Sequence, residues 1–452
     1  MSDITATLAT LRKELRGAVI QAGDPQYDQA RSVWNAAIDR RPAAIIQCAD
    51  VEDVARAVRI ASDRGEKLMV RGGGHNVAGR SIADGALMLD LSNLRSVRVN
   101  SAARLASVQG GALWSDVDAA TAISGLATTG GFVSTTGVGG LTLGGGVGWL
   151  MRRYGLASDN LRRASVVLAD GRFVHASLDE HADLFWGLRG GAGGLGVVSE
   201  FEFELHPVRD VLAGLMIFSA GDMLRVLQAF RTCAPQAPDE FCGVCAVCHA
   251  PPLPFLEAAH HGRPVLALGF CWCGDPARGE EAIAPFRGGI DPLATHIGVM
   301  PYVQWQKMQD PSAPPGVYNY WKTVNFDSLA DATLERLVAA ADELPSAETE
   351  IHLQHIGGAV ARADEATSAF ASRHAPFFAN LIGRSTSHEG LRAVREYVRG
   401  LYGQLAQAGT ATLQPNFADQ DDSDATRRFG TDGARRLAEL RHRYDPAGIF
   451  SL

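Results

Sequence analysis

Apolar residues recur at helical spacing just after residue 50. Val51, Val54 and Val58 share one face of a helical repeat, and Gly65 stands where such a helix would end. The apolar run "LMV" comes next and predicts a strand, which leads directly into "RGGGHN" at residues 71–76. We therefore expect an α/β unit with a glycine-rich loop at the carboxyl end of its strand.

Segments with helical spacing and segments with strand-like alternation continue along the chain. "GALMLDLSNLRSVRVNSAARLASVQGGA" has short apolar runs split by polar turns, which predicts strands, and residues 113–124 predict a helix. "HADLFWGLR" has a helical pattern, whereas "VVSEFEFEL" alternates like a strand, and "YNYWKTVNF" and "IHLQHIGGA" also read as strands. No internal repeat occurs, so these patterns predict a compact fold of mixed helices and strands.

The composition is that of a globular protein with room for two or three domains. The 452 residues are 46% hydrophobic and 20% charged, and the net charge is -8. The sequence contains no block of five or six like charges, which argues against a nucleic-acid or anionic-membrane partner. Neither an export signal nor a run of about 18 apolar residues is present in the sequence. We expect a cytoplasmic protein that acts on a small-molecule substrate.

Seven cysteines, an odd number, argue against a disulfide framework. The spacing in "CGVCAVC" (Cys242, Cys245 and Cys248) is similar to that of iron–sulfur ligands. A fourth cysteine followed by proline is missing there, and the flanks are apolar and strand-like. We therefore predict buried structural thiols and no metal site.

Two more segments are rich in glycine. Nine of the 21 residues at 128–148 are glycine, too many for one turn, which indicates a backbone-lined groove for a flat or extended ligand. "GGAGGLG" fits G-x-G-x-x-G through Gly191, Gly193 and Gly196. A nicotinamide-binding fingerprint needs a strand before it and a helix after it, and the reverse is predicted here.

The loop at residues 71–76 places three glycines directly before His75. Successive backbone N–H groups of such a loop can line a concavity that fits a phosphate. His75 at its edge can bind the ligand, react with it or order the loop, and the residues alone leave these roles open.

Five blocks of sequence together resemble a known family. They are "RGGGHNVAG" at 71–79, "GALMLDLSNL" at 85–94, "GVGGLTLGGGVGWLMRRYGLASDNL" at 137–161, "DLFWGLRGGAGGLGVV" at 183–198 and "RYDPAGIF" at 443–450. In this order they look like the berberine-bridge-enzyme-like branch of the vanillyl-alcohol-oxidase flavoprotein superfamily. The blocks span nearly the whole chain.

This resemblance implies an α+β fold with a two-part FAD-binding domain (PCMH-type), made of residues 1–207 and 395–452. It implies a substrate domain at 208–394, built on an antiparallel sheet covered by helices. The first glycine loop would hold the FAD pyrophosphate, and His75 would be joined to the flavin 8α-methyl, since a neutral imidazole is a competent nucleophile. Val133 stands where many relatives carry a second attachment cysteine, so we expect FAD bound covalently through one histidine.

The resemblance also implies the other cofactor-binding residues. They are Arg71, Gly72, Gly73, Gly74, Asn76, Gly79, Ser134, Thr135, Thr136, Gly137, Gly140, Gly144, Gly145, Gly148, Trp149, Asp159, Asn160, Gly196, Val198 and Asn416.

The catalytic residues are less well defined by the resemblance. Gln414 and Phe417 stand in "LQPNFADQDD" where sugar-oxidising relatives often carry tyrosines, so the usual base is absent. "YNYWKTVNF" and "IHLQHIGGA" resemble the strands of the substrate domain that face the flavin. Our candidates for substrate orientation or proton abstraction are therefore Tyr320, Lys322, His352 and Gln354.

The favoured function is an FAD-dependent oxidase that takes hydride from a C–H next to an alcohol or amine. Molecular oxygen would accept the electrons and give hydrogen peroxide. Thr136 stands at the position that governs oxygen access in the family, so a dehydrogenase with another acceptor stays open. A ligand-binding protein that has lost turnover also stays open, as does the choice between monomer and homodimer.

Overall fold

The structure is a computed structural model that describes residues 4–410 and 412–450. Its N-terminal sheet has the strand order β1-β2-β4-β3, in which β2, β4 and β3 run parallel. The strands are β1 (Ala18–Gln21), β2 (Ala44–Gln47), β3 (Leu68–Arg71) and β4 (Leu87–Asp90). Three helices accompany them, namely α1 (Ile4–Glu14), α2 (Tyr27–Arg31) and α3 (Val51–Arg64).

Helix α3 follows the predicted apolar spacing. Val54 and Val58 are buried in the core of this first unit. Asp50 caps the helix by accepting from the N–H of Asp53, and Gly65 ends it in the left-handed conformation at φ 68°. The α/β unit predicted before the first glycine loop is therefore confirmed.

A second, antiparallel sheet has the strand order β5-β6-β10-β8-β9. Its strands are β5 (Val97–Asn100), β6 (Leu105–Gln109), β8 (Leu161–Val167), β9 (Phe173–Ala176) and β10 (Val197–Glu204). The helices α4 (Trp114–Ala122), α5 (Val138–Leu143), α6 (Met151–Tyr154) and α7 (Ala182–Leu188) lie between these strands in sequence. The short pair β7 (Leu126–Ala127) and β11 (His206–Pro207) leads to the next sheet.

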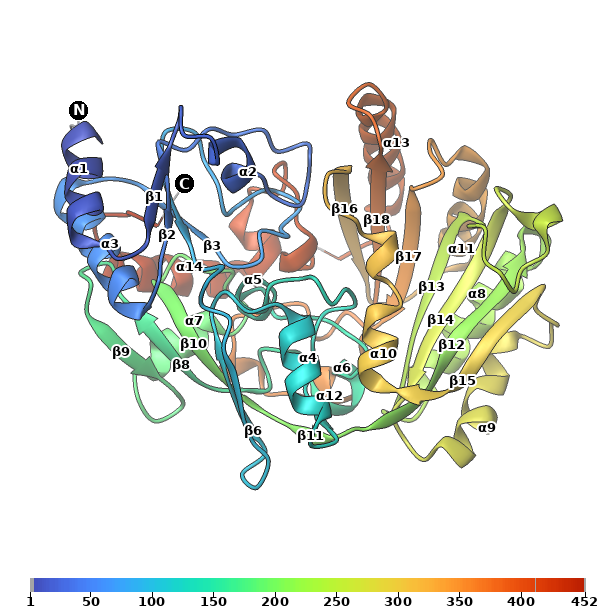
Figure 1. Cartoon of the computed structure of the whole chain (residues 1–452). Helices are drawn as coiled ribbons and strands as arrows, with labels where there is room; N and C mark the ends of the chain where they lie inside the picture. Colours follow the sequence, from blue (N-terminus) through green and yellow to red (C-terminus); the bar gives the residue numbers. More distant parts are fainter. Residues whose placement is uncertain (1–3, 411, 451–452) are drawn as a thin grey trace.

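The largest sheet has seven antiparallel strands in the order β15-β12-β14-β13-β17-β18-β16, on the right in Figure 1. They are β12 (Asp210–Ser219), β13 (Phe241–His249), β14 (Pro264–Trp272), β15 (Ala294–Pro301), β16 (Tyr318–Phe326), β17 (Glu350–His355) and β18 (Phe377–Ser385). One face packs on α8 (Met223–Cys233), α11 (Asp331–Ala339) and α13 (Gly390–Leu405). The other helices of this region are α9 (Gly279–Ile283), α10 (Tyr302–Lys307) and α12 (Gly358–Arg362).

The C-terminal segment returns to the first two sheets. Helix α14 (Ala425–Tyr444) packs on α7, and the carbonyl of Ile449 accepts from the N–H of Leu68 at the start of β3. Helix α13 packs on β16 and β18, so it accompanies the seven-stranded sheet across the expected boundary at residue 394. The core behind the other side of this sheet also includes residues 147–156, so the sheet packs on the first part of the chain as well.

The α+β fold with an antiparallel sheet covered by helices is confirmed. The three cysteines of "CGVCAVC" lie on β13, where Cys242 and Cys248 are on one face and Cys245 is in the helix-covered core. No group of three metal-ligating side chains occurs within residues 4–410 and 412–450. In the same residues, no helix is both long and apolar enough to cross a membrane.

Candidate cofactor site and active site

The first glycine loop leaves the end of β3 and packs backbone against backbone on the second glycine segment. A Cβ added at Gly73 would lie 2.6 Å from the Cα of Gly137, so a side chain there is excluded. Gly74 and Gly79 have positive φ values of 64° and 65°, which favour glycine. The loop is therefore bare because of both backbone conformation and close packing.

His75 lies in this loop with its ring stacked on Trp34, at 4.3 Å between ring centroids and 15° between planes. Trp34 in turn meets the edge of Trp321 on β16. The Nε2 atom of His75 is buried and has no hydrogen-bond partner. Burial lowers the pKa of His75 to about 4, so the imidazole is neutral near pH 7. A buried, neutral, unpartnered ring nitrogen is available to a ligand.

Arg71, which the resemblance places among the cofactor-binding residues, is hydrogen-bonded to other parts of the protein. Its guanidinium donates to both carboxylate oxygens of Asp90, at 3.1 and 2.5 Å, and to the carbonyl of Ala30 at 2.5 Å. Asp90 also accepts from Ser92. Arg71 therefore fixes the start of the glycine loop, and its charge is already compensated.

In the second glycine segment, several predicted residues also contact other parts of the protein. Ser134 donates to Asp310 through its N–H and its hydroxyl, at 2.8 and 2.6 Å. The amide of Asn416 donates to the carbonyls of Gly140 and Leu141 and accepts from the N–H of Gly146. The C-terminal segment therefore holds the turn that follows α5.

Some predicted cofactor contacts have structural roles in this fold. Asp159 forms a buried ion pair with Arg373, and Asn160 donates to the carbonyls of residues 154 and 156. Trp149 is in the core against Phe132 and Trp305. Close packing explains three glycines, each next to other main chain or to an aromatic ring: Gly145, Gly148 and Gly196. The carbonyl of Val198 lies against Gly110, where an added Cβ would be 2.3 Å away.

The strands β16, β18 and β17 present one apolar and one polar face. Tyr320 and Lys322 are in phase with Val324, so they lie on the face that packs on α13. The opposite face, here called the polar face, turns toward the glycine loops, since Trp321 contacts Trp34 and Phe417. The polar face carries Asn319, Trp321, Thr323, Asn325, Glu350, His352, Gln354, Asn380 and Arg384, together with the apolar residues Phe378 and Ile382.

Tyr320 and Lys322 are therefore not placed as the sequence analysis expected. The hydroxyl of Tyr320 donates to Asp421 at 2.6 Å and accepts from Arg399, while Lys322 Nζ donates to buried Asp422 at 2.8 Å. The physical reason is strand alternation, because these residues share the phase of the apolar core. Their polar groups are satisfied away from the polar face.

His352 and Gln354 do lie on the polar face. His352 Nε2 is 2.7 Å from Glu350 Oε2, and Arg384 Nη1 is 3.7 Å from Glu350 Oε1. Burial would raise the pKa of Glu350, but the charge of Arg384 and the hydrogen bond from His352 outweigh it and lower the pKa to about 2. Glu350 is thus a carboxylate that orients the imidazole of His352.

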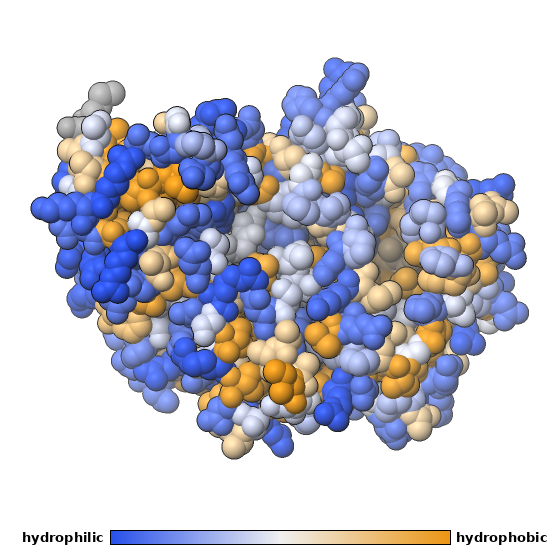
Figure 2. Space-filling model, viewed as in Figure 1, coloured by the Kyte–Doolittle hydropathy of each residue, from blue (hydrophilic) through white to orange (hydrophobic). Residues whose placement is uncertain are grey.

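The polar face also carries hydrogen-bond acceptors without partners. Gln354 Oε1 and Asn380 Oδ1 are buried and unpaired. Gln414 donates to Asn325, and its backbone N–H donates to Thr323, so the C-terminal segment closes one side. Figure 2 shows the surface hollowed between the region of α2 and the base of α13, where the first unit meets the seven-stranded sheet. These acceptors suit a ligand with N–H or O–H groups.

Sequence reasoning missed Trp34, Trp321, Glu350, Asn380 and Arg384. The signal for Trp321 was present in "YNYWKTVNF". Side chains alternate along a strand, so if Val324 and Phe326 face the core, Trp321 faces the opposite side of the sheet. The same reasoning separates Glu350 from its core-facing neighbours Ile351 and Leu353.

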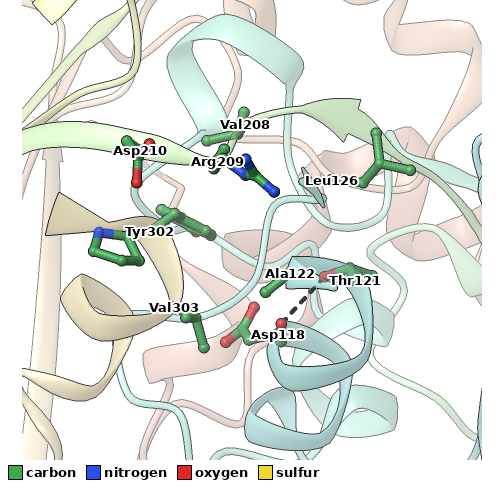
Figure 3. A pocket seen from close by; sticks show the side chains of 10 residues that line it. Asp118, Thr121, Ala122, Leu126, Val208, Arg209, Asp210, Tyr302 and Val303 are labelled. Carbon is green, nitrogen blue, oxygen red and sulfur yellow. Dashed lines mark hydrogen bonds between the residues drawn. The ribbon is translucent and has the colours of Figure 1, made fainter. Parts of the chain in front are cut away.

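A separate cavity of about 390 Å³ lies between α4 and α10 (Figure 3). Asp118 and Tyr302 line it, together with Arg209 at its exposed side. Burial raises the pKa of Asp118 to about 7, although the amide of Gln306 donates to it. His75 and the polar face do not contribute to this cavity.

Comparison with known proteins defines the class. Residues 42–177 match the family model described as FAD binding domain. The chain is 29% identical to (R)-6-hydroxynicotine oxidase of Paenarthrobacter nicotinovorans over 96% of this chain and 95% of that protein. It is 27% identical to an FAD-linked oxidoreductase of Dictyostelium discoideum, over 97% and 94% of the two chains.

Solved structures agree. The crystal structure of 6-hydroxy-D-nicotine oxidase from Arthrobacter nicotinovorans covers 96% of both chains with a TM-score of 0.86 and 27% identity. The BBE-like 1 protein of Physcomitrella patens has a TM-score of 0.89 at 20% identity over 98% of both chains, which shows the shared fold. The chain is an FAD-binding oxidoreductase. Its resemblance to the berberine-bridge-enzyme-like branch of the vanillyl-alcohol-oxidase superfamily is confirmed.

Proposed function

We propose that this chain is an FAD-dependent oxidase that carries its cofactor covalently on His75. The observation that carries this proposal is the buried Nε2 of His75, which has no partner in a loop stripped of side chains. The burial that lowers the pKa of His75 to about 4 supports it, since attachment requires the neutral ring. Backbone N–H groups of Gly72–Gly74 would approach the pyrophosphate.

The reaction would remove hydride from a carbon next to an alcohol or amine and a proton from the heteroatom, giving a carbonyl or an imine. Bound FAD supplies the hydride acceptor, and dioxygen takes up the electrons and becomes hydrogen peroxide. The polar face would hold the substrate next to Trp321. Gln354 and Asn380 would accept hydrogen bonds from the N–H or O–H groups of the substrate.

His352 is our candidate for the proton acceptor. Its Nε2 donates to the Glu350 carboxylate, which leaves Nδ1 with a lone pair for the substrate proton. Glu350 then stabilises the imidazolium that forms, and Arg384 keeps Glu350 ionised. This assignment replaces Tyr320 and Lys322, whose polar groups are paired on the other face.

Covalent attachment is tested by acid precipitation of the purified protein. The wild-type pellet should stay yellow, and His75→Ala should release its flavin into the supernatant. His374→Ala is the matched control, since that side chain is 73% exposed and should leave the pellet yellow. A colourless wild-type pellet would contradict the proposal.

A dehydrogenase is the second candidate, because Thr136 stands at the position that the resemblance links to oxygen access. Anaerobic reduction with substrates drawn from alcohols, amines, sugars and phenols, followed by admission of air, separates the two. An oxidase regains its yellow colour within seconds and releases hydrogen peroxide. A dehydrogenase stays bleached until another acceptor is added.

A further inference from the structure

A group of partly buried arginines lies where the first glycine loop and helix α14 supply side chains. Arg80, Arg428 and Arg441 form no ion pair or hydrogen bond with a carboxylate among residues 4–410 and 412–450. Arg428 and Arg441 reach only the carbonyls of Ser423 and Gly191, both at 3.4 Å. Arg428 Nε is buried and has no partner.

These arginines come from the two parts of the chain that enclose the expected cofactor. Arg80 directly follows Gly79 at the end of the first glycine loop, whereas Arg428 and Arg441 both lie on α14. The two α14 residues are 13 positions apart, and the kink at Gly430, with φ 68° and ψ 167°, separates the helix into two segments between them. A Cβ on Gly194 would lie 3.2 Å from Arg441 Nε, so the glycine segment at 190–196 borders Arg441.

Their electrostatics are unfavourable in the protein alone. Burial and the charge of Arg428 lower the pKa of Arg80 to about 10, although Asp422 and Asp419 act in the opposite direction. Burial and the charge of Arg441 lower the pKa of Arg428. Gathering like charges in partly desolvated positions costs free energy, and a bound anion offsets that cost.

FAD brings such an anion to this region. Its diphosphate carries two negative charges, and the loop N–H groups donate hydrogen bonds but no net charge. Arg71 does not supply that charge, because Asp90 already holds both sides of its guanidinium. Guanidinium groups are also the side chains best matched to phosphate oxygens.

We propose that Arg80, Arg428 and Arg441 form an anion site that receives the diphosphate of FAD. This inference rests on the FAD of the proposed function and adds a cofactor-holding role for the C-terminal helix. The glycine loop would shape the site, and the three arginines would supply its charge.

The test uses the full chain with His75→Ala, so that FAD binds reversibly. Each arginine is changed to Met in this background, and the dissociation constants of FAD and riboflavin are measured by flavin fluorescence. Arg435→Met is the matched control, because Arg435 lies on the same helix, is 66% exposed and pairs with Asp432 and Glu439. Riboflavin has the same ring system and no phosphate.

Each Met variant at the three sites should weaken FAD binding by about tenfold or more, as expected for a lost charged hydrogen bond. Riboflavin binding should stay unchanged, and Arg435→Met should bind both ligands like its parent. Inorganic pyrophosphate should compete with FAD in the parent and less in the Met variants. FAD affinities equal to that of Arg435→Met would overturn the proposal, as would equal losses for riboflavin.

Folding and charge are separated by Lys variants at the same positions. Arg→Lys keeps the charge and should give FAD affinities between those of Met and Arg, with the unfolding temperature of the ligand-free protein unchanged. If Met variants do not fold, Lys variants with parental FAD affinity contradict the role of the guanidinium groups. A wild-type chain that contains no FAD would refute the proposed function itself, whereas loaded wild type with unaffected variants refutes only this inference.

Discussion

Replacing Glu350 by Gln tests how the polar face would act in catalysis. The carboxylate accepts from His352 Nε2 at 2.7 Å and lies 3.7 Å from Arg384 Nη1. Its pKa of about 2, set by Arg384 and His352 against the effect of burial, keeps it ionised at any assay pH. The substitution therefore removes a full negative charge and leaves the side-chain volume nearly unchanged.

The expected magnitude follows from that hydrogen bond. A hydrogen bond to a charged group contributes about 1.5–3 kcal/mol, and 1.36 kcal/mol is tenfold in rate, so Glu350→Gln should slow flavin reduction by about 10- to 100-fold. His352→Gln removes the acceptor itself and should cost about 10²- to 10⁴-fold. Because Glu350 acts through His352, the double variant should be no slower than His352→Gln alone.

The assay is anaerobic stopped-flow reduction of the flavin with saturating substrate from the screen. Glu343→Gln is the matched control, since that carboxylate pairs with Arg336 at the surface and should leave the rate unchanged. Flavin content and thermal unfolding are checked for each variant. Wild-type rates in both single variants, or effects that multiply in the double variant, would refute the proposed roles.

Four further outcomes follow from the contacts and pKa values described above. Tyr320→Phe should leave the rate of flavin reduction within about twofold of wild type, because the hydroxyl of Tyr320 bonds to Asp421. Lys322→Met should lower the free energy of unfolding in urea by about 3–5 kcal/mol, because it leaves buried Asp422 without its ion pair. Asp118→Asn should raise stability at pH 8 by up to about 4 kcal/mol and have little effect at pH 4. The folded pKa of Asp118, about 7, lies above its unfolded value, so wild-type stability falls as the pH rises toward 7. Flavin incorporation into ligand-free protein should decline as the pH is lowered, because protonated His75 is not a nucleophile. Since burial lowers the pKa of His75, the midpoint should lie near pH 4, and a midpoint near 6.5 would show an exposed ring.

Local patterns in the sequence were enough for the elements that surround the site. The spacing of Val54 and Val58 and the stop at Gly65 predicted α3, and the alternation in "VVSEFEFEL" predicted β10. The glycine loop follows from composition, since its backbone needs positive φ and close packing. These features depend on neighbours in sequence, which is why they were accessible.

Long-range pairing was not accessible in the same way. Arg71 has the sequence context of a cofactor ligand, yet Asp90, on the adjacent strand, takes its charge. Glu350 and Arg384 lie 34 positions apart and meet only through the register of β17 on β18. Which face of β16 turns inward depends on apolar neighbours such as Val324, and a motif-based choice of Tyr320 ignored that phase.

The mass of one tryptic peptide tests covalent attachment of FAD to His75 most directly. Cleavage after Arg71 and Arg80 releases residues 72–80, "GGGHNVAGR". In flavin-containing wild-type protein this peptide should carry the mass of FAD less two hydrogens, with fragment ions that place the addition on His75. An unmodified peptide from yellow protein, or the flavin on another peptide, would contradict this attachment.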